Sequence, residues 1–117
     1  MSDYPPQYLV FIELFNARRY RDCVEPLEVI WFARRDDFHK ALIRMCVGLN
    51  QIGLGLESGP RFLLTTAREL LEPYGERHEG LDLHRLRDFL FEAEALLGQE
   101  LPRVIPSYTI RIEEQRS

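Results

Sequence analysis

Residues 23–31 read CVEPLEVIW, and this stretch decides the kind of fold that the sequence predicts. A helix drawn through it has apolar side chains on both sides, with Leu27 facing one way and Val29 the other. It also carries two glutamates, Glu25 and Glu28, with a proline between them. The pattern therefore predicts an interior helix whose carboxylates need partners within the protein, because an interior helix has little solvated surface.

Four further segments on either side of this stretch have helical periodicity, and only the end of the chain alternates like a strand. The predicted fold class is all-α, a compact five-helix bundle with an extended C-terminal tail. We expect one helical domain over residues 1–117. Its predicted helices cover residues 6–17, 21–34, 37–54, 59–74 and 82–98, and the tail covers residues 101–117.

Two kinds of helix can be told apart by their polar faces. The fourth and fifth are amphipathic and are expected at the surface, whereas the second and third are apolar nearly all round and are expected in the middle. Gly48 lies within the third helix and predicts a close helix contact. In the tail, the alternating Tyr108, Ile110 and Ile112 are expected to lie along the bundle.

Composition excludes several classes of function. The net charge is −4, so binding to nucleic acid would gain little from counterion release. The start of the chain has no cationic leader, and its apolar runs, such as LVFI and VIWFA, are far shorter than the ~18 residues of a membrane span. We expect a soluble, cytoplasmic protein with no membrane or nucleic-acid partner. Cys23 and Cys46 lie in apolar runs and are expected to be free.

A second polar strip is predicted on the third helix, at Arg44 and Gln51. If this strip faces Glu25 and Glu28, the guanidinium of Arg44 becomes a partner for buried carboxylates, which would be costly to leave unpaired. Tyr20 and Trp31 lie close enough in sequence to join them. The candidate polar cluster is therefore Tyr20, Glu25, Glu28, Trp31, Arg44 and Gln51.

The run LFNARRYRDCVEPLEVIW, residues 14–31, resembles the signature of a bacterial and archaeal family called domain of unknown function 309. That signature reads Leu-Phe-Asn, a tyrosine four residues after the Asn, then His-Glu-x-Leu-Glu and a tryptophan three further on. The positions in register are Leu14, Phe15, Asn16, Tyr20, Glu25, Leu27, Glu28 and Trp31. The similarity extends over residues 9–97 and implies a compact multihelical bundle, but no particular reaction.

Two departures from the family bear on metal binding and catalysis. The family's histidine before the first glutamate is Val24 here, and a histidine of its second block aligns with Gln51. The three histidines that are present, His39, His78 and His84, have no ligand-like spacing. The sequence therefore predicts no catalytic residue, no metal ligand and no cofactor, and it favours a protein that is not an enzyme.

Two functions remain open. The first is a non-enzymatic interaction or scaffold module in which Glu25 and Glu28 form a structural hydrogen-bond network. Such a module would bind a protein partner or form a homodimer through the tail or through an apolar strip of the first helix at Val10 and Leu14. The alternative is an enzyme or a small-ligand or metal-binding protein, with a polar pocket between the second and third helices where the candidate cluster converges.

Overall fold

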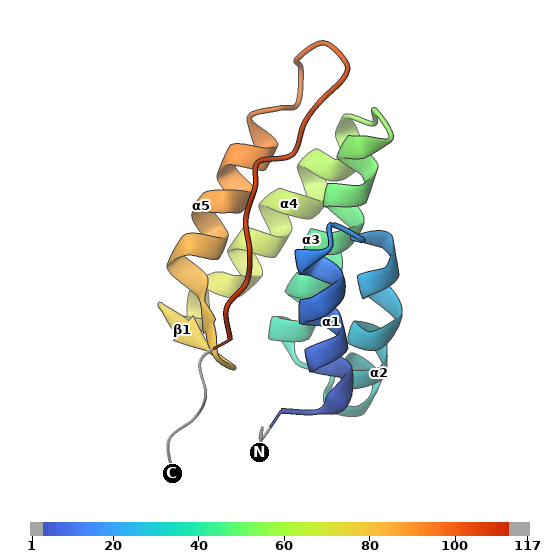
Figure 1. Cartoon of the computed structure of the whole chain (residues 1–117). Coiled ribbons are helices and arrows are strands. Elements are labelled where there is room, and N and C mark those ends of the chain that lie inside the picture. The colour runs from blue at the N-terminus through green and yellow to red at the C-terminus, as the bar shows by residue number, and fades with distance from the viewer. Residues whose placement is uncertain (1–3, 113–117) are drawn as a thin grey trace.

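A computed structural model describes residues 4–112 and contains five α-helices (Figure 1). They are α1 (Pro6–Asn16), α2 (Val24–Arg34), α3 (Asp37–Gly53), α4 (Ser58–Leu71) and α5 (Leu83–Glu94). Single 3-10 turns precede α2 at Arg21–Cys23 and follow α4 at Glu72–Tyr74. The predicted all-α, five-helix fold is confirmed. The last predicted tail residues, 113–117, lie outside the described part of the chain.

Side-chain caps explain where two of the helices begin. The Asp36 carboxylate accepts the backbone N–H of His39 at 2.8 Å before α3, and Asp82 accepts the N–H of Arg85 at 3.0 Å before α5. The fourth helix begins one residue before its predicted start at residue 59. Ser58 is the first residue of α4, and Glu57 precedes it without a side-chain cap bond.

The helices pack in chain order, each against the next, and the molecule extends over 48 × 25 × 25 Å. A close approach of backbone to side chains joins α3 to α4 at Gly48. A Cβ atom built on Gly48 would lie only 2.9 Å from Cδ2 of Leu64 and 3.3 Å from Cβ of Leu63. The close helix contact predicted at Gly48 is therefore confirmed.

The second helix lies elsewhere than expected. α3 occupies the middle of the bundle, but α2 lies at its edge and packs mainly on α1, α3 and the turn before it. Its core side chains are Leu27 and Ile30, whereas Val29 and Phe32 on the outer side are 50% and 57% exposed. An apolar stretch predicts burial on both sides, but among residues 4–112 no other helix covers the outer face of α2, where Val29 and Phe32 are exposed.

A two-stranded hairpin between α4 and α5 was not expected. β1 (Arg77–His78) pairs antiparallel with β2 (Leu81–Asp82), and Glu79 and Gly80 form the turn with φ values of 48° and 75°. Strands this short leave no alternating pattern that a sequence could reveal. The hairpin leads directly into α5 and places Asp82 at the start of that helix.

The tail runs back along the bundle between α5 and α1, as the red segment of Figure 1 shows. The side-chain amide of Asn16 donates to the carbonyl of Ile110 at 3.0 Å, and its oxygen accepts the N–H of Ile110 at 2.8 Å. We call this two-bond contact the Asn16 clamp. Tyr108 stacks on Phe89 with ring centroids 5.0 Å apart, and Ile110 is buried. The expected position of the tail is confirmed.

Both cysteines are free and buried, as expected. Cys23 lies at the end of the 3-10 turn before α2, and Cys46 lies in α3. Burial raises the pKa of the Cys46 thiol well above its usual value, and the neighbouring Cys23 side chain adds to this effect. Cys46 therefore serves as a small core side chain in its protonated form, and Cys23 is likewise buried in the core.

Candidate functional site

The two glutamates that the sequence singled out do not lie in an interior network. Glu25 is exposed and Glu28 is half-buried. Within residues 4–112, neither carboxylate makes a hydrogen bond or an ion pair. The expected structural network of Glu25 and Glu28 is thus not formed, because the flank of α2 that carries them lies at the edge of the bundle.

The other four members of the predicted cluster are scattered over the fold. Tyr20 is buried against Phe15, with ring centroids 5.3 Å apart, and desolvation raises the pKa of its hydroxyl. The guanidinium carbon of Arg44 lies 5.7 Å from the ring centroid of Phe62 on α4. Arg44 therefore faces α4 and leaves the glutamates of α2 without the partner that the sequence suggested.

The remaining two residues, Trp31 and Gln51, lie in separate places as well. The guanidinium carbon of Arg35 lies 4.4 Å from the ring centroid of Trp31, at the end of α2. Gln51 lies against the start of α4, where a Cβ built on Gly59 would approach its Oε1 to 2.5 Å. Its Oε1 atom is buried and lacks a hydrogen-bond partner in the described structure. The six residues do not converge, so the predicted pocket between the second and third helices is not formed by them.

A different surface feature lies on the outer side of α1 and α2. A shallow groove of about 300 Å³ runs between the two helices at the edge of the bundle. It is lined by Pro6, Gln7, Val10, Glu25, Pro26 and Val29. Val10 is 44% exposed, and Glu25 is the one charged residue of the lining. We call this feature, together with Phe32 one turn beyond Val29, the α1/α2 face.

The sequence anticipated only part of this face. Val10 was named as a member of an exposed strip, and it is exposed; Leu14, its expected companion, is half-buried against the core. Pro26 and Val29 were missed as surface residues because α2 was placed in the interior. Their i, i+3 spacing was the available signal, since it puts both on one side of the helix.

Charges flank the α1/α2 face along α2. Glu25 and Glu28 lie in the first half of the helix, whereas Arg34 and Arg35 lie at its end. Arg34 pairs with Glu79 at 3.2 Å, and the Arg35 guanidinium covers the rings of Trp31 and Phe32. The outer side of α2 is therefore acidic at its start, apolar in its middle and basic at its end.

Two searches of the described residues bear on other kinds of site. No group of three or more His, Cys, Asp or Glu side chains within residues 4–112 is close enough to hold a metal ion. In the same part of the chain, none of the helices combines the length and the apolar character that crossing a membrane requires. The absence of a metal ligand set from this chain stays a prediction of the sequence.

The fold and this surface define a small all-α protein with an apolar groove at one edge. Residues 8–61 match the family model described as Domain of unknown function (DUF309), so the resemblance read from the sequence is confirmed over these residues. The match covers nearly all of α1 to α3 and ends early in α4, whereas the similarity was expected to reach residue 97. No curated protein and no solved structure matches the chain.

Proposed function

We propose that this protein is a non-enzymatic interaction module of one domain that pairs with a second copy of itself through the α1/α2 face. The observation that carries the proposal is the exposure of α2. Val29 is 50% exposed and Phe32 is 57% exposed, on the outer side of the helix beside the groove that α2 forms with α1. Grouped apolar side chains of this size are typical of surfaces that another protein covers.

A second copy fits this face by symmetry. In a two-fold dimer the same patch meets itself, so Val10 and Val29 of one copy would contact the same apolar patch of the other. If two α2 helices cross antiparallel near Val29, Glu25 of one copy lies level with Ala33 of the other and close to Arg34. The acidic start of α2 then meets its basic end, and the apolar middle is buried in the centre.

Analytical ultracentrifugation of the full chain over a concentration series tests the proposal. The wild type is expected to approach a mass of twice 13.8 kDa as its concentration rises. Val29→Asp places a charge in the centre of the interface, where it would be desolvated without a partner, and should give the monomer at every concentration. Circular dichroism checks that the helices are retained, since Val29 contributes little to the core.

Val104→Asp is the matched control. Val104 is 75% exposed and lies in the tail, so its replacement introduces the same charge away from the α1/α2 face. It is expected to leave the dimer intact. A wild type that stays monomeric at the highest concentration would contradict the proposal. A dimer that Val104→Asp dissociates and Val29→Asp does not would instead place the interface in the tail.

A further inference from the structure

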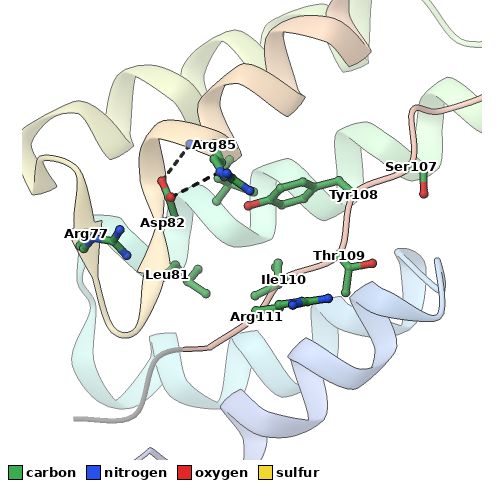
Figure 2. Close-up of a pocket in the computed structure, with 10 residues that line it drawn as sticks. Arg77, Leu81, Asp82, Arg85, Ser107, Tyr108, Thr109, Ile110 and Arg111 are labelled. Atoms are coloured by element: carbon green, nitrogen blue, oxygen red, sulfur yellow. Dashed lines mark hydrogen bonds and ion pairs between the residues drawn. The ribbon is translucent and has the colours of Figure 1, made fainter. Parts of the chain in front are cut away.

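A cavity of about 700 Å³ lies away from the α1/α2 face. It opens where the hairpin and the start of α5 meet the tail, as Figure 2 shows. Leu81, Leu86 and Ile110 belong to its wall and are almost fully buried, so they form a rigid base. Pockets of small organic ligands commonly measure ~300 to 1,000 Å³, and this cleft falls within that range. We call it the tail cleft.

Three arginines line the tail cleft: Arg77 from β1, Arg85 from α5 and Arg111 from the tail. Asp82 is the one acidic residue of the lining, so three positive charges and one negative charge leave the cleft with a net charge of +2. The whole chain carries −4. An isolated positive cleft on an acidic protein attracts anions specifically to that place, because the surrounding surface repels them.

The carboxylate of Asp82 is already engaged at the start of α5. Its Oδ1 accepts the backbone N–H of Arg85, and its Oδ2 lies 3.8 Å from Nε of the same residue (Figure 2). The hydrogen bond from the Arg85 N–H is the main cause that lowers the pKa of Asp82, and the charges of Arg77, Arg85 and His84 lower it further. The guanidinium of Arg111 has no hydrogen bond or ion pair within residues 4–112. Asp82 therefore compensates the charge of Arg85 in part, and the guanidinium of Arg111 keeps its donors for a further anion.

The tail adds hydroxyl groups to this positive cleft. Ser107, Tyr108 and Thr109 all belong to its lining, and Tyr108 points from the tail toward Arg85 in Figure 2. Burial raises the pKa of the Tyr108 hydroxyl, and the nearby Asp82 adds to this, so at neutral pH the group is a neutral hydrogen-bond donor. The Asn16 clamp fixes the backbone at Ile110, between Thr109 and Arg111. The tail side of the cleft is thus held in place before any ligand arrives.

From this geometry we propose that the tail cleft binds a small polyanion whose phosphate or carboxylate groups are held by Arg85 and Arg111. Guanidinium groups pair with both kinds of anion through parallel N–H donors, which a single positive charge on lysine cannot do. The hydroxyls of the tail supply further donors, and the volume admits a molecule larger than a single phosphate ion. The ligand class is therefore a phosphorylated or polycarboxylate small molecule.

Isothermal titration calorimetry of the full chain tests the proposal, with pyrophosphate and citrate as separate probes and glycerol as the uncharged comparison. The buffer has low ionic strength, because salt screens exposed charges. We expect saturable binding of at least one anion and none of glycerol. Pyrophosphate alone would identify phosphate as the recognised group, citrate alone would identify carboxylate, and binding of both would indicate recognition of negative charge in either form.

Arg85→Gln and Arg111→Gln should each weaken binding by about tenfold, the loss expected for one charge-assisted contact. The matched control is Arg61→Gln, which removes the same charge from an exposed position on α4, far along the chain from the tail cleft. It should change the affinity by less than about twofold. The backbone N–H that Asp82 accepts is retained in Arg85→Gln, so the start of α5 is preserved.

Two results would overturn the proposal. One is the absence of binding by either anion to the wild type. The other is equal weakening by Arg61→Gln and by the two cleft variants, which would show attraction to overall charge and no defined site. Neither result depends on the dimer, because Arg85 and Arg111 lie outside the α1/α2 face, and sedimentation of the same variants should be unchanged.

Discussion

Replacing Gly48 by alanine tests the tight contact between α3 and α4. The new Cβ would lie 2.9 Å from Cδ2 and 3.1 Å from Cγ of Leu64, which is closer than side-chain carbons approach one another, so Leu64 or α4 must shift. Overpacking of this kind costs about 1–3 kcal/mol. Alanine in place of a helical glycine returns ~1 kcal/mol of backbone propensity. The free energy of unfolding should therefore fall by roughly 0–2 kcal/mol.

Gly53→Ala provides the reference for this measurement. Gly53 is also in α3, but no atom lies within 4 Å of a Cβ built on it, so only the propensity changes and stability should rise by up to about 1 kcal/mol. The two variants should then differ by about 1–3 kcal/mol in urea unfolding followed by circular dichroism. In a Leu64→Ala background the two nearest colliding atoms are absent, and Gly48→Ala should be clearly less destabilising. Equal effects of Gly48→Ala in both backgrounds would refute the packing argument.

Three further predictions concern side-chain contacts. Glu94→Gln should lower the free energy of unfolding by about 1–2 kcal/mol in urea titrations, because the Glu94 carboxylate pairs with Arg68 and accepts Thr65 Oγ1 at 2.7 Å. Asn16→Ala should speed amide hydrogen exchange at residue 110, measured by mass spectrometry, because it removes both bonds of the Asn16 clamp. Asp82→Ala should cost about 0.5–2 kcal/mol at neutral pH, and this cost should vanish as the pH falls through the lowered pKa of Asp82.

Each of these three predictions has a control, which is a substitution elsewhere in the chain or a change of pH. Glu92→Gln on the exposed side of α5 should be neutral within about 0.5 kcal/mol. Glu13→Ala, on the exposed side of α1, should leave the exchange at residue 110 unchanged. For Asp82, the sign follows from a carboxylate whose pKa is lower in the folded state, since it stabilises the fold above its unfolded pKa and loses this effect in acid. If Asp82→Ala still lowers the free energy of unfolding at a pH below the pKa of folded Asp82, the helix cap is excluded as the cause.

The amphipathic segments and the tail were predictable because local patterns decide them. The amphipathic stretches that start at residues 59 and 82 predicted helices α4 and α5, although α5 ends at Glu94 and the prediction extended to residue 98. The alternation of Tyr108, Ile110 and Ile112 reflects direct contact with the core, so it was visible in the sequence. Such features depend on the periodicity of apolar residues and on the residues at helix ends, and both can be read directly from the sequence.

The candidate site could not be predicted because it depends on which helix faces which. The apolar pattern of α2 predicts that both sides of the helix are buried. It does not say whether another helix of the chain or another molecule buries them. Glu25 and Arg44 were expected to meet, yet Arg44 packs on Phe62 of α4. The tail cleft joins Arg77, Arg85 and Arg111 across more than thirty positions, and no spacing rule connects them.

The Asn16 clamp has a consequence for synthesis of the protein in the cell. Its two partners, Asn16 and Ile110, are 94 positions apart, so a growing chain on the ribosome can complete its helices long before it can close this contact. Arg111, which follows Ile110 directly, reaches the tail cleft at the same late moment. An intermediate whose emerged chain stops short of residue 110 would thus have its helices in place while the tail side of the cleft is still missing.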